Sequence, residues 1–368
     1  MSTKKDKFTI KDKNYMRLAI QLARSRKGLT GDNPSVGCVI VKNDEIISIG
    51  VTSHNGRPHA ESNAIKNSFQ NLKNSKMYLT LEPCNHYGKT SPCTNKIIKS
   101  GINEVYYSVD DIDLRVKGKS LNILSKKNIK VKKGLLKEEA LKLYDSYIVN
   151  KTRKLPFVSA KIAISKNKLI YSQGTKRITN NITDKFTHFL RFKNDGIMIS
   201  SRTLNIDDPK LNCRLKGFEN FSPKRIILDK NLEINLKSYI FKSIKENNTL
   251  IFHSSKNNTK LKILRKKGAI LIDTKLNKKN RFNLNLIFKK LFTFGIRNLL
   301  IEGGNNITRD LIEKRLVNNF YLLKCSKVLS KNKKNLTFTS LDILDRNYKI
   351  KKKLSFKLET DIINIYKR

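Results

Sequence analysis

The stretch Leu81-Glu82-Pro83-Cys84 organises the first part of this chain, together with His59-Ala60-Glu61 before it and Cys93 after it. A catalytic zinc ion needs three protein ligands and one open position, and one histidine with two cysteines supplies them. His59, Cys84 and Cys93 are therefore the expected ligands of one zinc ion per chain. Glu61 follows the first ligand by two residues, where its carboxylate can carry protons for a water molecule that zinc activates.

Hydrophobic periodicity predicts alternating helices and strands around these residues. The expected elements are a helix over 14–27 that Gly28 ends, hairpin strands 36–41 and 45–50 joined at Asn43-Asp44, a helix over 59–68, a strand over 77–81, a helix over 93–99 capped by Gly101, and a strand over 105–109. His59 and Cys93 begin helices in this scheme, where the helix dipole lowers a thiol pKa. The alternation predicts a layered α/β domain.

A polar, basic segment that ends at a proline, Val149 to Pro156, predicts the boundary between two domains. It follows a helix expected to end near Tyr147, which gives domains over 1–149 and 155–368. A second α/β pattern then begins, with strands expected at 157–163, 196–199, 225–228, 249–252 and 299–301. The last strand leads into Glu302-Gly303-Gly304, which either holds a phosphate on backbone N–H groups or is a plain glycine turn.

The chain is strongly basic, with a formal net charge of +47. This charge is either a nucleic-acid-binding surface or the lysine-rich composition of an AT-rich genome. Lysines occur almost evenly along the chain without an RNA-binding signature, which favours composition and no specific nucleic-acid partner. No apolar run is long enough to span a membrane, and the first residues lack the apolar core of a signal peptide. Thiolate ligands among five cysteines point to a reducing cytoplasm.

The spacing of the two cysteines is informative about the class of enzyme. His-x-Glu followed by Pro-Cys-x-x-Cys is typical of zinc-dependent nucleobase deaminases, but here eight residues separate Cys84 from Cys93. This longer spacer, together with Asn33 to Ile40 and Gly56 to Glu61, closely resembles the deaminase half of the bifunctional deaminase–reductases of riboflavin biosynthesis. The resemblance implies a three-layer, cytidine-deaminase-like domain that acts on a diaminopyrimidinone carrying a phosphoribosylamino group.

The resemblance also implies substrate contacts for the first domain. The positions that match the family's contacts are Asn33, His86, Lys89 and Asp110. Two alternatives stay open: Lys89 could be a solvated loop lysine, and His86 could be a fourth ligand that closes a structural zinc site. The chain departs from the family at the turn that begins with Asp110 and at Thr52, where the family has a histidine.

The second half resembles the reductase half of the same family, over Phe157 to Ser165, Ile178-Thr179, Arg202 to Pro209 and Glu302 to Gly304. That half is similar to dihydrofolate reductase in fold and uses NADPH to reduce the ribose of the deaminated product. The positions that match NADPH contacts are Ala163, Arg177, Thr203, Asp207, Lys230, Gly304, Asn305, Asn306, Ile307, Thr308, Arg309 and Asp310, and those that match substrate contacts are Lys161, Thr175, Leu211, Arg214 and Glu302.

Departures in the second half leave its activity open. Lys168 stands where the family has a turn glycine, beside an altered Asn167, and Arg177 replaces an aromatic residue. We expect a cytoplasmic, bifunctional enzyme with a phosphorylated pyrimidine substrate, no membrane partner and, as the family implies, a homodimeric or homotetrameric assembly. The alternatives are a deaminase with an inactive reductase half and a tRNA or other nucleic-acid deaminase with a basic RNA-binding module.

Overall fold

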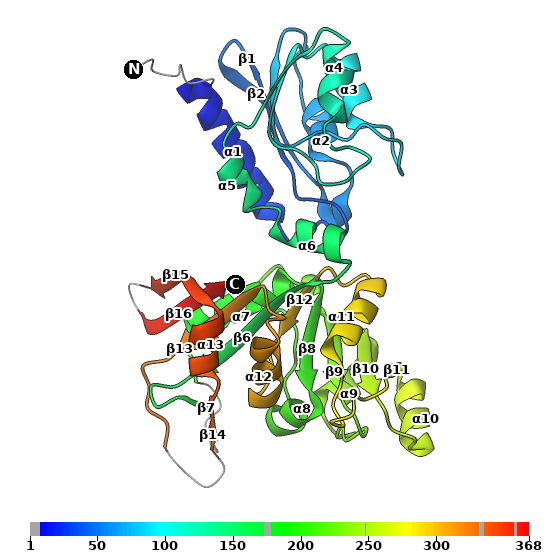
Figure 1. The fold of residues 1–368 in the computed structure, drawn as a ribbon, viewed down its shortest axis with the longest axis vertical. Helices are drawn as coiled ribbons and strands as arrows, with labels where there is room; N and C mark the ends of the chain where they lie inside the picture. The colour runs from blue at the N-terminus through cyan, green and yellow to red at the C-terminus, as the bar shows by residue number, and fades with distance from the viewer. Residues whose placement is uncertain (1–7, 173–177, 247, 331–334, 357–358, 368) are drawn as a thin grey trace. The chain divides into compact units, whose positions relative to one another are not determined.

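The structure is a computed structural model that describes residues 8–172, 178–246, 248–330, 335–356 and 359–367. The chain divides into two compact units, Met1–Lys154 and Leu155–Arg368 (Figure 1). In the described residues, no helix is both long and apolar enough to cross a bilayer.

The first unit is a five-stranded sheet between two layers of helices. The strand order is β2-β1-β3-β4-β5, with β1 antiparallel to β2 and β3, and with β3, β4 and β5 parallel. The strands are β1 Gly37–Lys42, β2 Glu45–Val51, β3 Lys76–Leu81, β4 Glu104–Val109 and β5 Lys130–Lys133. The helices are α1 Ile10–Arg26, α2 Ala60–Lys66, α3 Cys93–Ser100, α4 Lys119–Ser125, α5 Lys137–Leu141 and α6 Asp145–Arg153, with a 3-10 turn η1 at His54–Gly56. Helices α1 and α5 lie on one side of the sheet, and α2, α3 and α4 lie on the other (Figure 1).

Local chemistry explains where these elements begin and end. Asn43 and Asp44 both have positive φ, 50° and 64°, which is the turn that joins two-residue hairpins. Gly101 takes the left-handed conformation at φ 79° and ends α3, as the sequence predicts. Thr9 and Asp12 form a reciprocal capping box at the start of α1, which extends this helix beyond its predicted first turn.

The predicted end of the helix before the domain boundary is wrong. The helix expected to end near Tyr147 continues as α6 to Arg153, into the predicted boundary segment. Lys151 and Arg153 lie in its last turn, where positive charge is favourable at a helix C-terminus. The helix ends because Lys154 adopts positive φ of 53°, just before the proline of Leu155-Pro156.

The second unit is built on a nine-stranded sheet of order β11-β10-β9-β8-β12-β6-β13-β16-β15. Strands β6 and β8 to β13 are parallel to one another, and β16 is antiparallel to β13 and β15. The strands are β6 Phe157–Ile164, β8 Gly196–Ser200, β9 Lys224–Leu228, β10 Thr249–His253, β11 Ile270–Asp273, β12 Asn298–Ile301, β13 Asn319–Lys324, β15 Lys349–Phe356 and β16 Glu359–Lys367, and a small separate sheet pairs β7 Leu169–Tyr171 with β14 Leu336–Thr337.

Helices cover both faces of this sheet. They are α7 Asn181–Phe192, α8 Ser201–Asp207, α9 Tyr239–Lys242, α10 Asn258–Lys267, α11 Leu284–Thr293, α12 Asn305–Glu313 and α13 Leu341–Asn347, with 3-10 turns η2 Glu219–Phe221 and η3 Ile244–Glu246. Neighbouring residues of β8 belong to two different cores: Met198 packs in one, and Ile197 and Ile199 pack in the other. The order of the parallel strands reverses where β12 inserts between β8 and β6, and such a switch point is where open α/β sheets bind ligands.

Candidate active sites

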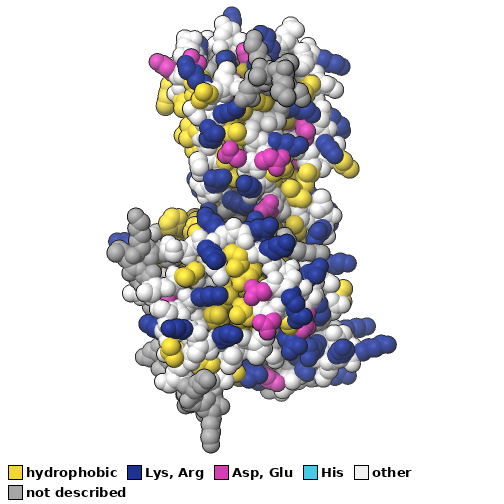
Figure 2. All heavy atoms as spheres, turned by 60° about the vertical axis from the view of Figure 1, so that its left-hand side comes forward, with side chains coloured by type: hydrophobic (Ala, Val, Ile, Leu, Met, Phe, Trp, Pro, Cys, Tyr) yellow, Lys and Arg dark blue, Asp and Glu magenta, His cyan; other side chains and the backbone are white. Residues whose placement is uncertain are grey.

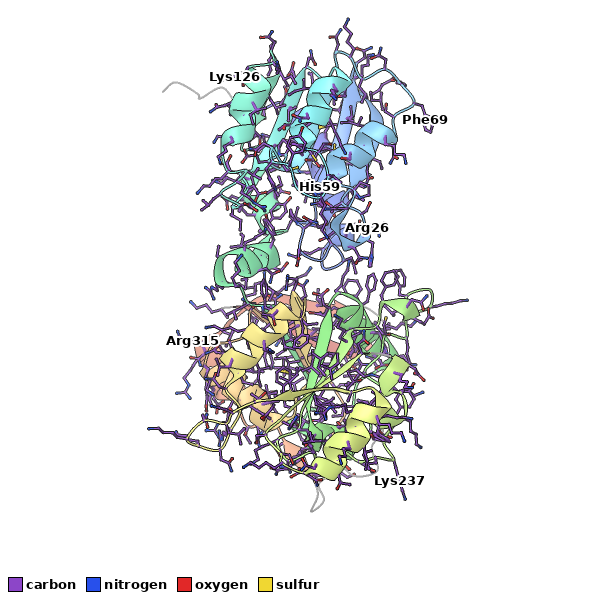
Figure 3. All side chains as sticks on the ribbon, turned by 90° about the vertical axis from the view of Figure 1, so that its right-hand side faces the viewer. Arg26, His59, Phe69, Lys126, Lys237 and Arg315 are labelled. Atoms are coloured by element: carbon purple, nitrogen blue, oxygen red, sulfur yellow. The ribbon has the colours of Figure 1, made fainter. Side chains whose placement is uncertain are left out.

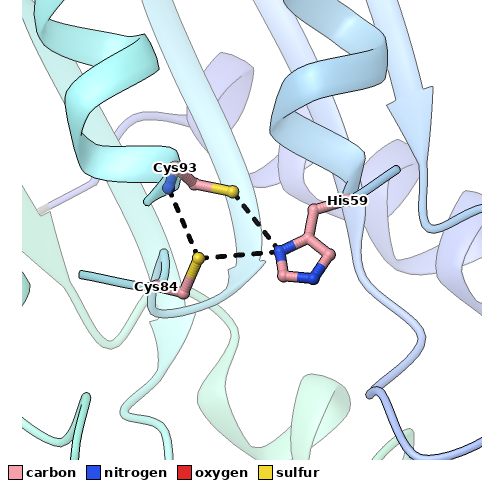
Figure 4. Close-up of side chains that lie close together, drawn as sticks. All are labelled: His59, Cys84 and Cys93. Carbon is pink, nitrogen blue, oxygen red and sulfur yellow. Dashed lines mark hydrogen bonds between the residues drawn. The ribbon is translucent and has the colours of Figure 1, made fainter. Parts of the chain in front are cut away.

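Three side chains from separate elements converge in the first unit. His59 is the N-cap of α2, Cys93 is the first residue of α3, and Cys84 follows the end of β3. His59 Nδ1 lies 3.6 Å from Cys84 Sγ and 3.4 Å from Cys93 Sγ (Figure 4). The three ligand atoms lie within 4.8 Å of one another, which suits donors around one ion. His59 lies inside the unit, whereas Lys126 and Phe69 point outward (Figure 3).

The chemistry of this donor set fits zinc. A hydrogen bond with Cys93, and then one with His59, lowers the pKa of the Cys84 thiol to about 4, so this ligand is available as a thiolate. The contact with Cys84, followed by burial, raises the pKa of Cys93 well above its ordinary value. Within the described residues, the His, Cys, Asp and Glu side chains close enough to share a metal ion are these three, and His86 is not among them. With three protein donors, a zinc ion here would keep one coordination position for a ligand from outside the protein.

Glu61 lies in the first turn of α2, beside the three candidate ligands. Its side chain is buried, with 4% of the residue exposed. Burial raises the pKa of Glu61 above its ordinary value, and the charge of His59 opposes this effect. A carboxyl group with a raised pKa can both accept and return a proton near neutral pH.

Glu82, to which the sequence analysis assigns no role of its own, holds the segment that carries Cys84. Its buried carboxylate accepts backbone N–H bonds from Asp111 (3.1 Å), Gly118 (3.0 Å) and Ser120 (3.1 Å). Ser120 in turn donates its hydroxyl to the carbonyl of Pro83 at 2.6 Å. One carboxylate therefore fixes the loop after β4 against the residues that precede the zinc ligand.

The predicted substrate contacts of the first domain lie in different surroundings. Asn33 donates its side-chain amide to the carbonyl of Gly56 at 3.2 Å, and a Cβ added at Gly56 would lie 2.4 Å from Asn33 Nδ2. His86 is half-buried, and its Nδ1 atom has no hydrogen-bond partner in the described structure. Lys89 is exposed. Asp110 accepts hydrogen bonds from Tyr107 at 3.0 Å and from a lysine of β5.

A cleft of about 1330 Å³ opens in the second unit at the switch point of its sheet. Its walls come from the ends of β6, β8, β9 and β12 and from the first turns of α8 and α12. The predicted site residues that line it are Lys161, Ala163, Thr203, Asp207, Leu211, Lys230, Glu302, Gly304, Asn305, Asn306, Ile307, Arg309 and Asp310. A Cβ added at Gly303 would lie 2.1 Å from Ile307 Cγ2, so this turn has no room for a side chain.

Two described residues of the predicted second site, Thr308 and Arg214, are not part of this lining. Thr175 and Arg177 lie outside the described residues. Thr308 is buried within α12, with its hydroxyl 3.5 Å from the carbonyl of Gly303. Arg214 is exposed and donates to the side chain of Asn212 at 2.8 Å, away from the cleft wall.

Glu302 is the centre of a buried charge cluster at the base of the cleft. Its carboxylate receives Nε and Nη2 of Arg191 at 2.8 and 3.1 Å and Nζ of Lys161 at 3.1 Å. Burial alone would raise the pKa of Glu302, but the charges of Arg191 and Lys161 hold it well below its ordinary range. Arg191 Nη1 also donates to the carbonyl of Asn212 at 3.1 Å, so the cluster ties the end of β12 to the loop after α8.

Comparisons with known proteins agree with both sites. The family described as "Cytidine and deoxycytidylate deaminase zinc-binding region" matches residues 9–109, and the "RibD C-terminal domain" matches residues 159–363. The "Riboflavin biosynthesis protein RibD" of Aquifex aeolicus is 33% identical over 97% of this chain and 98% of its own length. The chain belongs to the RibD family. The Actinobacillus pleuropneumoniae protein of the same name is 32% identical, over 97% of this chain and 96% of its own.

Solved structures of RibD proteins share the fold of the whole chain. Acinetobacter baumannii RibD is 25% identical, with a TM-score of 0.81, and covers 97% of this chain and 98% of its own. A "diaminohydroxyphosphoribosylaminopyrimidine deaminase/5-amino-6-(5-phosphoribosylamino)uracil reductase" from Thermotoga maritima is 26% identical, with a TM-score of 0.82 and the same coverage. The predicted α/β class of both halves is therefore confirmed.

Proposed function

We propose that this chain carries out both reactions named for its Thermotoga maritima relative. It would deaminate 2,5-diamino-6-(5-phosphoribosylamino)pyrimidin-4(3H)-one and then reduce the ribosyl group of the product to a ribityl chain, two steps of riboflavin biosynthesis. The observation that carries the proposal is the convergence of His59, Cys84 and Cys93 beside the buried Glu61. The RibD C-terminal match over 159–363 supports the second reaction.

In the deaminase domain, which we place over 1–149, the candidate residues would have three different roles. His59, Cys84 and Cys93 would hold zinc, which lowers the pKa of a bound water. Glu61 would take a proton as that water attacks the ring carbon and would return it to the departing amine, which leaves as ammonia. Asn33, His86, Lys89 and Asp110 would orient the pyrimidine and its phosphoribosyl group.

In the reductase domain, which we place over 155–368, the cleft would hold NADPH and the deaminated product together. NADPH supplies the hydride. The backbone N–H groups at the start of α12 can hold its phosphates, because Gly303 and Gly304 allow close approach there. Lys161, which lines the same cleft and is paired with Glu302, would face the substrate.

The proposal also covers the cellular compartment, the kind of partner and the oligomeric state. All five cysteines are free, which supports a reducing cytoplasm. Lys and Arg side chains are spread over the displayed face of each unit among acidic and apolar ones (Figure 2), which supports a small-molecule substrate over a specific nucleic-acid partner. We expect a homodimer or homotetramer, which light scattering can test.

One assay tests both reactions. The zinc-loaded protein, the diaminopyrimidinone phosphate and NADPH are combined, and ammonia and NADPH are followed together. The expected result is release of one ammonia for each NADPH oxidised, and a Glu61→Gln variant should keep its zinc but release no ammonia. Near-normal ammonia release by that variant would remove Glu61 from its role. Ammonia release without NADPH oxidation would show a deaminase with an inactive reductase half.

A further inference from the structure

Arg57 reaches from the segment before the first zinc ligand to the spacer between the other two. Its Nη1 donates to the hydroxyl of Thr90 at 2.7 Å, across 33 positions of the sequence. A Cβ added at Gly88 would lie 3.5 Å from Arg57 Nη2, so the guanidinium lies along the spacer backbone. The side chain therefore sits beside the loop that carries His86 and Lys89.

The positive charge of Arg57 has no acidic side chain paired with it in the described residues. The spacer from Asn85 to Pro92 contains no acidic residue. Among the ion pairs of the described residues, none includes Arg57, and Thr90 is the one side chain there that accepts a hydrogen bond from it. An arginine that uses one of its five N–H groups keeps the others for an anion, and its planar fork matches two oxygens of a phosphate.

We propose that Arg57 is a further substrate-binding residue of the deaminase site and that it holds the phosphate of the phosphoribosylamino group. This inference rests on the proposed function of the first unit. The ring must lie at the zinc ligands for its amine to be displaced, so the phosphoribosyl arm must leave the site along its rim. The spacer and Arg57 form one part of that rim, and Arg57 and Lys89 there present two positive charges to a dianion.

A purely structural role for Arg57 makes a different prediction. If the residue only fastens the spacer to the segment before His59, loss of the Thr90 hydroxyl should impair the site as much as loss of the guanidinium. If Arg57 binds phosphate, Thr90→Val should have little effect, because the charge remains. Thr90 is exposed, so this control variant leaves the core unchanged.

The experiment compares two substrates in three proteins. Ammonia release is measured for the unmodified protein, Arg57→Gln and Thr90→Val, with the phosphorylated pyrimidine and with the same compound after phosphatase treatment. We expect Arg57→Gln to lose about tenfold to a hundredfold in kcat/KM for the phosphorylated substrate, mainly through KM, because a hydrogen bond to a charged group is lost. Its kcat/KM for the dephosphorylated substrate and its zinc content should be unchanged.

Two results would overturn the inference while leaving the proposed function intact. One is an equal loss by Arg57→Gln on both substrates, and the other is a phosphate-specific loss by Thr90→Val as large as that of Arg57→Gln. If the unmodified protein deaminated neither pyrimidine, the proposed function would fail, and this inference with it.

Discussion

Replacing Arg191 by methionine should destabilise the second unit more than a typical single substitution does. Methionine is unbranched and apolar, so it can occupy part of the space, but it removes the guanidinium that lies 2.8 and 3.1 Å from the carboxylate of Glu302. It also removes the bond to the carbonyl of Asn212. Among the described residues, Lys161, at 3.1 Å, would then be the one remaining cation paired with Glu302.

The magnitude follows from burial. The side chains of Arg191 and Glu302 are each 10% exposed, so a carboxylate that loses its partner cannot be rescued well by water. Removal of one member of a buried pair costs about 3–5 kcal/mol. Because Lys161 still pairs with Glu302 in the variant, we expect a loss near the lower limit, about 3 kcal/mol. For a domain of this size, each kcal/mol lowers Tm by about 2–4 °C, so the melting transition of the second unit should fall by about 6–12 °C.

A double-mutant cycle identifies the cause. Arg191→Met, Glu302→Gln and the double variant are melted under the same conditions, and the transition of the second unit is followed by circular dichroism. Because Arg191→Met and Glu302→Gln disrupt the same buried ion pair, the loss of Tm in the double variant should be smaller than the sum of the two single losses. A fall of less than about 2 °C for Arg191→Met, or fully additive losses in the double variant, would refute the reasoning.

Three further outcomes follow from the same contacts. Glu82→Gln replaces a carboxylate that accepts three backbone N–H groups with an amide, whose NH2 group cannot accept them. The first unit should therefore lose about 2 kcal/mol of stability in urea titrations and bind zinc more weakly. The control variant Glu104→Gln, in the same sheet, should bind zinc normally. Burial, followed by the charges of Arg191 and Arg214, lowers the pKa of His188 to about 4. The unfolded chain therefore binds this proton more readily, so stability should fall by up to ~3 kcal/mol as pH drops from about 6.5 to about 4, and His188→Asn should flatten the curve in that window. Removal of zinc with a chelator should lower the Tm of the first unit but not of the second, and added zinc should restore it.

The sequence predicts the zinc ligands and most strands because each depends on short-range information. His59, Cys84 and Cys93 are residue types that zinc requires, and each stands at the end of an element that periodicity can find. The arrangement of helices and strands around them follows from the same patterns. The start of α1 and the end of α6 are misplaced, the latter because its basic last turn resembles a linker in composition, and α4, β5 and α5 are not predicted.

The supporting residues were harder to predict because their partners are distant in sequence. The donors to Glu82 come from 29 to 38 residues later, and Arg191 lies 111 residues before Glu302. One signal for Arg191 was nevertheless present. Thr183, Thr187 and Leu190 lie on the buried face of α7, and helical spacing places Arg191 on the same face. A charged residue on a buried helix face needs a partner of opposite charge. An acidic partner for Arg191 can therefore be expected from the sequence, even though the sequence does not show which residue it is.

The turn between β6 and β7 shows how the departures in the reductase half affect its structure. Lys168 does adopt positive φ, 63°, at the position where the family has glycine, which costs about 1 kcal/mol for a residue with a side chain. Asn167 offsets this cost, because its side chain accepts from Leu329 N at 3.1 Å and donates to Leu329 O at 2.8 Å. Ser165 closes the turn by accepting the Lys168 and Leu169 N–H groups. Lys168 thus adopts the positive φ that glycine favours, and it is not part of the cleft lining. These two departures therefore give no structural reason for an inactive reductase, and the NADPH assay tests chiefly the segment that contains Arg177.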